Sequence, residues 1–177
     1  MNGGSKFTAP WETPLMLTTV FSTIVLVGIA MIGIKVIAPL ALVWGLVTTA
    51  LALLPLAVAA LFSIRGYVLT SDNLSIQRLG WHTRLPLATL LSVEVDPEAT
   101  SGSVRVFGNG GMFCFAGTFA NDRLGSYRAF GTDRGRAVVL KFSERTVVIT
   151  PGDPQAFAAK ITELRNLSGS HTNRQLE

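Results

Sequence analysis

The stretch that decides the fold of this chain covers residues 15–64 and reads LMLTTVFSTIVLVGIAMIGIKVIAPLALVWGLVTTALALLPLAVAALFSI. Lys35 is the single formally charged residue in it. A helix needs about 20 apolar residues to cross the hydrocarbon core of a bilayer, at about 1.5 Å per residue. Residues 15–34 and 39–64 each supply such a run, whereas a core helix of a soluble domain normally keeps a polar stripe. The stretch therefore predicts a hairpin of two transmembrane helices.

The residues that flank the two runs predict how the hairpin is oriented. The connection is a tight turn, with Lys35 at the headgroups and Pro39 in the first turn of the second helix. Lys6 precedes the first run, and three arginines follow the second: Arg65, Arg78 and Arg84. Because positive charge stays in the cytoplasm, both termini and the rest of the chain are expected there. The first run is too long for a signal peptide and no small-x-small cleavage site precedes Lys35, so it should stay uncleaved.

Small residues line one side of the second predicted helix. Ala41, Gly45 and Thr49 follow each other at four-residue spacing, which lets helices approach closely in lipid. This stripe is expected to pack on the first helix or on another copy of the chain. Pro55 should kink the same helix. Apart from Lys35 the segment carries no ionisable side chain, so nothing in it indicates an ion or proton pathway.

The remainder of the chain, about 110 residues, has the usual size of one compact domain. From residue 65 onward thirteen basic residues stand against ten acidic ones, without a basic cluster. This mild excess argues against nucleic-acid binding and suits a domain close to an anionic membrane face. Before the first run, residues 1–13 form a polar segment in which Trp11 marks the membrane interface. The single cysteine, Cys114, excludes an internal disulfide.

Beyond the second run, short alternating runs replace the continuous apolar pattern and predict β-strands. Residues 67–70 and 74–78 form a first hairpin, and residues 137–142 and 146–150 form a later one. The pattern predicts about seven short strands in all. Small all-β domains must cover the edges of their sheets, so an additional element is expected to close the open end.

An amphipathic helix follows the strands and supplies that cover. Asp153 is a good N-cap, and Pro154 is suited to the first helical position. One face of the helix, which should end near residue 167, carries Phe157, Ile161 and Leu164. The polar residues 168–177 are expected to be a disordered tail.

Several short segments stand out in the predicted domain: GYVLTSDNL at 66–74, Pro86-Leu87 and SVEV at 92–95, and further segments at 107–113, 127–132 and 145–151. Together they resemble bacterial PH-like (pleckstrin-homology-like) domains that occur beside transmembrane helices. The resemblance implies antiparallel strands in two bent sheets, a sandwich or barrel, capped by a C-terminal helix. It brings no catalytic residues and no agreed ligand. The expected architecture is a transmembrane hairpin over 14–64 and a mainly-β PH-like domain over 65–167, in a bacterial inner membrane.

Three arginines close to the second helix are the candidate contacts to anionic lipid headgroups. Arg65, Arg78 and Arg84 lie near the tether, where each charge contributes about 1 kcal/mol to binding an anionic surface. The alternative is that they are ordinary solvated charges. The loop of the first hairpin, residues 71–73, holds an acidic residue and no basic one. Under the resemblance, this lack of a basic residue argues against inositol phosphate binding of the familiar type. A looser basic group is mixed with acids and indicates a solvated face: Arg123, Arg128, Arg134 and Arg136.

Two further features are weaker candidates for chemistry. Gly108-Asn109-Gly110-Gly111 resembles a phosphate loop, but a strand follows it instead of Lys-Ser/Thr and a helix, which favours a tight turn. Cys114 and His82 are a conceivable nucleophile pair, although a buried, inert cysteine is favoured. His, Cys and carboxylate residues show no metal-ligand spacing, and no pattern indicates a cofactor.

The sequence therefore predicts a membrane-anchored interaction module that acts by protein–protein or lipid-headgroup contact and not by turnover. The alternative is a structural subunit of a larger membrane complex, assembled through helix packing and self-association. The partner would then be an unidentified membrane protein or a second copy of the chain. Replacement of Gly45 by Leu is expected to distinguish the two.

Overall fold

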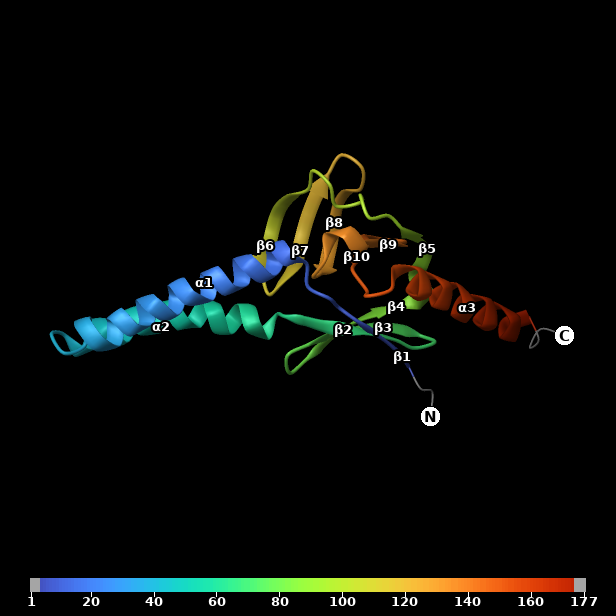
Figure 1. The fold of residues 1–177 in the computed structure, drawn as a ribbon. Helices are drawn as coiled ribbons and strands as arrows, with labels where there is room; N and C mark the ends of the chain where they lie inside the picture. Colours follow the sequence, from blue (N-terminus) through green and yellow to red (C-terminus); the bar gives the residue numbers. More distant parts are fainter. Residues whose placement is uncertain (1–3, 174–177) are drawn as a thin grey trace.

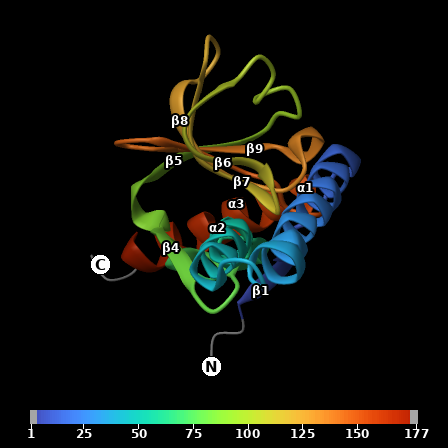
Figure 2. The ribbon, with the colours of Figure 1, turned by 90° about the vertical axis from the view of Figure 1, so that its left-hand side faces the viewer.

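The computed structural model describes residues 4–173, with side chains described for residues 4–165. Two long helices form a hairpin that projects from a body of two β-sheets, and a third helix lies on the opposite side of that body (Figure 1). Figure 2, turned so that the hairpin points toward the viewer, shows the two sheets as separate layers. The expected order, a helical hairpin and then a mainly-β domain with a C-terminal helix, is therefore present.

The hairpin consists of α1 (Thr13–Ile32), which continues through a π-helical turn, η1 (Gly33–Ile37), and of α2 (Leu42–Leu61). Both helices are long and apolar enough to cross a membrane, with mean hydropathies of 2.4 for α1 with η1 and 2.1 for α2. Most of their large side chains are exposed, so the hairpin is not the buried core of the domain. Pro55 lies inside α2, and the kink expected from it remains a prediction.

The turn of the hairpin lies at 38–41, later than predicted. The Ala38 N–H donates to the carbonyl oxygen of Gly33, five residues back, at 2.9 Å. This widened helical turn carries the chain past Lys35 before it reverses. Pro39 consequently lies in the turn itself and not in the first turn of α2.

The small residues of α2 face α1. Gly45 is buried against Ala38, where an added Cβ would meet main-chain atoms at 2.5 Å. The Thr49 hydroxyl donates to the carbonyl oxygen of Gly45 at 2.9 Å and approaches that of Ala30 in α1 at 3.3 Å. Ala41, the third residue of the predicted stripe, is exposed at the start of α2. Gly45 and Thr49 therefore serve contacts within the hairpin.

The four-stranded sheet begins before the hairpin. β1 (Ser5–Thr8) pairs antiparallel with β2 (Ile64–Leu69), so the hairpin is inserted between two neighbouring strands of one sheet. This corrects two predictions: residues 1–13 are not wholly outside the domain, and residue 64 is not helical. The ring of Phe7 explains why β1 docks, because it packs edge-on against Phe157 with centroids 5.0 Å apart.

The strands form two separate sheets of orders β1-β2-β3-β4 and β5-β9-β10-β8-β7-β6. β10 enters between β8 and β9 and runs parallel to β8, so the expected wholly antiparallel arrangement is wrong. The described residues hold ten strands instead of about seven, and the two sheets do not close into a barrel. The other strands are β3 (Asn73–Arg78), β4 (His82–Pro86), β5 (Leu90–Val95), β6 (Val104–Met112), β7 (Cys114–Asn121), β8 (Gly125–Gly131), β9 (Val138–Phe142) and β10 (Thr146–Ile149).

β6 runs through Gly108-Asn109-Gly110-Gly111, where the sequence predicts a tight turn. The chain turns later, at Phe113, which has a φ of +64°. Gly108 has a φ of +112°, and a Cβ there would overlap the carbonyl oxygen of Ala116 on β7. The glycine therefore allows two strands to approach closely, and the segment is not a phosphate loop.

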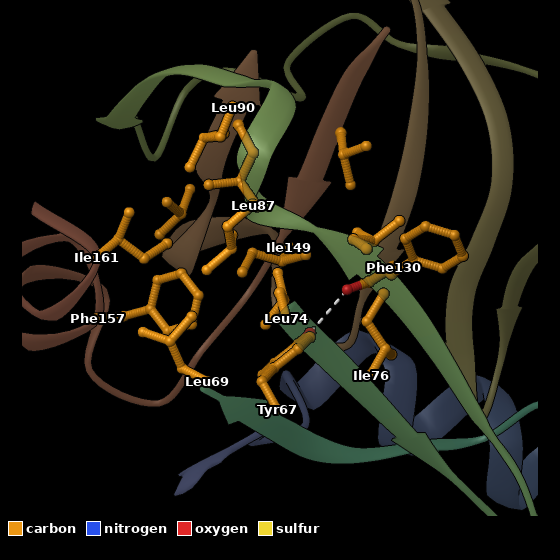
Figure 3. Close-up of a cluster of buried hydrophobic side chains, with 14 of the residues drawn as sticks. Tyr67, Leu69, Leu74, Ile76, Leu87, Leu90, Phe130, Ile149, Phe157 and Ile161 are labelled. Carbon is orange, nitrogen blue, oxygen red and sulfur yellow. Dashed lines mark hydrogen bonds between the residues drawn. The ribbon is translucent and has the colours of Figure 1, made fainter. Parts of the chain in front are cut away.

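The C-terminal helix, α3 (Pro154–Asn173), packs across the core between the sheets. The Asp153 carboxylate accepts the Ala156 N–H at 2.9 Å, which confirms the predicted N-cap. Phe157 and Ile161 are fully buried among side chains from both sheets (Figure 3). The helix extends beyond the predicted end near residue 167, and residues 174–177 of the expected tail lie outside the described residues.

Tyr67 joins the two sheets through the core. Its hydroxyl donates to the carbonyl oxygen of Phe130 on β8 at 2.7 Å (Figure 3) and accepts the Thr150 N–H at 3.2 Å. Its side chain is fully buried, and this burial raises the pKa of Tyr67 to about 12.

Candidate functional site

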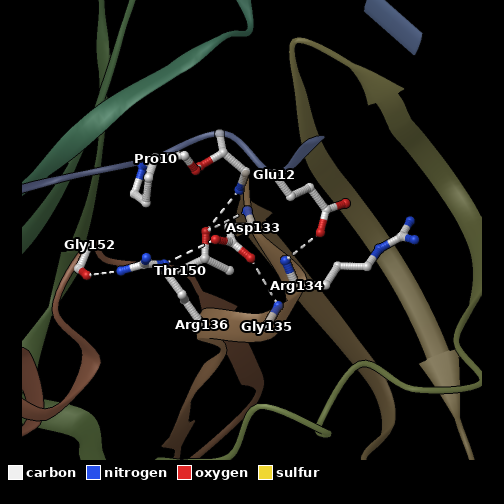
Figure 4. A network of polar contacts seen from close by, with 9 residues as sticks. Pro10, Glu12, Asp133, Arg134, Gly135, Arg136, Thr150 and Gly152 are labelled. Atoms are coloured by element: carbon white, nitrogen blue, oxygen red, sulfur yellow. Dashed lines mark hydrogen bonds and ion pairs between the residues drawn. The ribbon is translucent and has the colours of Figure 1, made fainter. Parts of the chain in front are cut away.

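The chain that leads into α1 is held by the six-stranded sheet. The Glu12 N–H donates to the carbonyl oxygen of Thr132 at 3.0 Å, and the Thr132 hydroxyl donates to that of Pro10 at 2.7 Å. The Glu12 carboxylate also accepts the Arg134 N–H at 3.0 Å (Figure 4). The first turn of α1 is therefore bonded to the domain.

The turn between β6 and β7 contacts α1 further along the helix. The Phe113 N–H donates to the hydroxyl of Thr19, which is only 5% exposed, at 3.0 Å. The ring of Phe113 also meets that of Trp11 edge-on, with centroids 5.9 Å apart. Two successive parts of α1 are thus fixed to one sheet.

The end of α2 is held by the other sheet and by β7. Arg78 Nη1 donates to the carbonyl oxygen of Phe62 at 3.0 Å, and Cys114 Sγ approaches the same oxygen at 3.3 Å. Trp81 Nε1 donates to the carbonyl oxygen of Leu61 at 3.2 Å. The last carbonyls of a helix lack helical donors and carry partial negative charge, so a guanidinium is a favourable partner.

Arg78 is an unusual cation because it is only 7% exposed. Its guanidinium lies over the rings of Trp81, Phe130 and Phe62, with distances to the centroids of 4.6, 5.4 and 5.5 Å. Its Nε finds no hydrogen-bond partner among the described residues. Burial lowers the pKa of Arg78 from its usual high value, and the nearby Arg128 acts in the same direction. An arginine nevertheless stays charged in a protein at neutral pH.

A groove of about 640 Å³ opens beside Arg78, between α2, the turn from β3 to β4, and the strands β6 to β8. We call it the junction groove; its walls include Pro55, Val58, Phe62, Arg78, Phe107 and Arg128. Arg128 is exposed, and its guanidinium lies 5.6 Å from the centroid of Phe130, the ring that Arg78 also covers. Neither arginine forms an ion pair within the part of the chain that the structure describes. The groove therefore combines an apolar wall with two uncompensated cations.

The match to a known family covers the domain that builds this groove. The family is described as the bacterial PH domain, and its match spans residues 65–164, more than half of the chain. The chain belongs to the bacterial PH domain family. No curated protein and no solved structure matches it. The family match begins after the hairpin, so this bacterial PH domain carries β1 and both apolar helices in addition to the matched region.

Of the three predicted headgroup contacts of this PH domain, Arg65 and Arg78 lie on the neighbouring strands β2 and β3 but beside different hollows. Arg78 lines the junction groove, whereas Arg65 is exposed and lines a second hollow of about 510 Å³ beside Trp11. Arg84 is exposed on β4 with its Nη2 3.1 Å from His82 Nε2. Arg128 was not among the predicted contacts. Arg128 and Phe130 are two residues apart on β8, so their side chains lie on one face of the strand. This spacing is the sequence signal that could have indicated Arg128.

The weaker candidates have structural explanations in this PH domain. Cys114 is fully buried, and burial raises the pKa of its thiol to about 11, which leaves little thiolate at neutral pH. Two members of the looser basic group form surface ion pairs, Arg123 with Asp96 at 2.8 Å and Arg136 with Asp133 at 3.0 Å. Among the described residues, no group of three His, Cys, Asp or Glu side chains is arranged to hold a metal.

Proposed function

We propose that this bacterial PH domain is a membrane-anchored interaction module. Its hairpin spans the bacterial inner membrane and holds the domain against the cytoplasmic face. The observation that carries this proposal is the insertion of the hairpin between β1 and β2, with both of its ends bonded to the domain. A flexible tether would only raise the local concentration of a domain at the membrane. A hairpin bonded at both ends also fixes which face of the domain meets the lipid.

The distribution of aromatic and charged residues along the hairpin supports a spanning position. Trp11 and Trp81 lie at the end nearest the domain, and Trp44 lies near the turn, as expected of residues that favour the two interfaces. Lys35 lies at the end of the hairpin that carries the turn, whereas four basic residues flank the end nearest the domain: Lys6, Arg65, Arg78 and Arg84. The positive-inside rule then orients the domain and both termini toward the cytoplasm.

The proposed activity is contact without turnover. The junction groove offers a surface for lipid, and β6 offers one for protein. β6 forms an edge of its sheet and exposes Val104, Val106 and Phe107. An exposed edge strand with apolar side chains is a typical site for the addition of a partner strand.

The alternative, a structural subunit assembled through its helices, receives less support. Its sequence argument is the stripe of small residues. In that stripe, Gly45 contacts the turn and Thr49 contacts α1 of the same chain. The hairpin needs these contacts for its own packing, so the stripe of small residues does not indicate contact with a further helix.

Extraction and labelling of the full-length protein in cells test the proposal. The protein should stay in the membrane pellet after alkaline carbonate treatment. In a Cys114→Ser background, a Lys35→Cys variant should react with a membrane-impermeant maleimide in cells with a permeabilised outer membrane, whereas Glu144→Cys should react only after lysis. Release by carbonate would refute the anchor, and labelling of Glu144→Cys from outside would reverse the orientation.

A further inference from the structure

We propose that the junction groove binds one anionic phospholipid, whose phosphate is held by Arg78 and Arg128 and whose acyl chain lies along α2. This inference rests on the proposed function, since the groove meets lipid only if the hairpin spans the membrane.

The two cations in the groove favour an anionic ligand. Arg78 is more than nine-tenths buried, donates from Nη1 to Phe62, and leaves Nε without a partner among the described residues. A buried donor without a partner is costly, and two like charges at one ring repel each other. Arg128 supplies the second charge over the ring of Phe130. A phosphate in the groove, which Arg78 and Arg128 both line, would neutralise both cations with charge-assisted hydrogen bonds.

A purely structural role for Arg78 explains less. A guanidinium that caps α2 accounts for the bond to Phe62 and for the stacking on Trp81. It does not account for the open groove or for Arg128, a second arginine at this groove that forms no ion pair among the described residues.

The apolar wall indicates a lipid as the source of the phosphate. Val58 and Phe62 are 45% and 42% exposed, and Phe107 on the facing strand is 79% exposed. α2 continues from this wall into the segment that would lie in the bilayer, so an acyl chain can enter the groove without passing through water. The volume of about 640 Å³ fits a headgroup and the first part of one chain. A soluble phosphate would leave the wall uncovered.

The test measures the retention of dioleoyl phosphatidylglycerol by native mass spectrometry of the full-length protein released from mixed micelles. The wild type should retain one molecule of it in preference to dioleoyl phosphatidylcholine. Arg128→Gln should weaken retention by about tenfold, as expected from the loss of a charge-assisted hydrogen bond. Arg145→Gln, which removes another exposed charge, from the turn between β9 and β10, should have no effect.

Two further measurements identify the ligand. Ala59→Phe fills the apolar wall without a change of charge and should reduce retention, whereas Ala57→Phe on the exposed side of α2 should not. Glycerol 3-phosphate at millimolar concentration should not displace the lipid. Displacement by it would overturn the lipid assignment in favour of a soluble phosphate, and equal retention by all variants would overturn the site.

The same variants separate this inference from the proposed function. Arg128→Gln and Ala59→Phe should remain in the carbonate-resistant pellet even where they lose the lipid. If the wild type itself is released by carbonate, the proposed function fails and this inference fails with it.

Discussion

Arg78 on β3 donates a hydrogen bond of 3.0 Å to the carbonyl oxygen of Phe62, the C-cap residue of α2. This bond joins the apolar hairpin to the matched domain at the wall of the junction groove. A ligand that contacts Arg78 therefore acts on a residue that also holds the helix in place.

Loss of Arg78 should loosen this attachment. Arg78→Ala is expected to lower the free energy of unfolding by about 2 kcal/mol, because a hydrogen bond to a charged group contributes about 1.5–3 kcal/mol. The stability of Arg78→Lys should lie between those of the wild type and Arg78→Ala, because an ammonium does not stack on Trp81 as a guanidinium does. Thermal unfolding of the full-length protein in detergent measures this, with the exposed Arg84→Ala as control. Equal stability of the two alanine variants would contradict the account.

The Tyr67 hydroxyl should contribute strongly to stability. Tyr67→Phe removes partners from the Phe130 carbonyl and the Thr150 N–H, which are buried, at a cost of about 1–3 kcal/mol. Tyr127→Phe loses one bond, to the Ser103 hydroxyl at 2.7 Å, in a half-buried position and should cost less. The order of the two melting temperatures checks this, and the reverse order would count against the proposed link between the sheets.

Stability should fall at alkaline pH. The pKa of Cys114 rises from 9.0 to about 11 and that of Tyr67 from 10.0 to about 12 on folding. The folded state then binds more protons than the unfolded state, so stability decreases as the pH rises from about 9 to 12. Cys114→Ser should reduce the loss at the lower end of this window, and Tyr67→Phe at the upper end. A wild-type stability that stays constant from pH 9 to 11 would contradict the raised pKa values of Cys114 and Tyr67 in the folded state.

Gly45→Leu should open the hairpin of the same chain. An added Cβ meets main-chain atoms of Ala38 in the turn at 2.5 Å, so the turn has to move away from α2. Ala50→Leu adds a similar volume on an exposed side of α2 and is the matched control. Melting temperature and light scattering in detergent are the two readouts. A change of oligomeric state in Gly45→Leu without a loss of stability would support the structural-subunit alternative instead.

The sequence predicts most clearly what depends on local pattern. The hairpin is recognisable because each of its helices is nearly uniformly apolar over about twenty residues. Helix α3 is recognisable because Asp153 and the spacing of Phe157 and Ile161 are local signals. The bacterial PH domain is likewise recognisable from short motifs in the matched region.

Features that depend on distant pairing are not predictable in this way. β1 is four residues long, and its partner lies beyond the hairpin, so only Phe7 marks it. The parallel pairing of β8 with β10 follows from the insertion of β10 between two strands, which no local period encodes. Arg78 and Arg128 are fifty positions apart in the sequence, and their guanidinium groups lie near the same ring, that of Phe130, only in the folded domain.

The position of Trp81 relative to the bilayer tests the central claim most directly. A full-length protein with Trp81 as its only tryptophan, made by Trp11→Phe and Trp44→Phe, is reconstituted into liposomes that contain brominated lipids. Trp81 is 42% exposed and bonded to the end of α2, so its fluorescence should be quenched most by bromines close to the headgroup. Equally weak quenching at all bromine depths would show that the domain is not held against the membrane and would contradict the account.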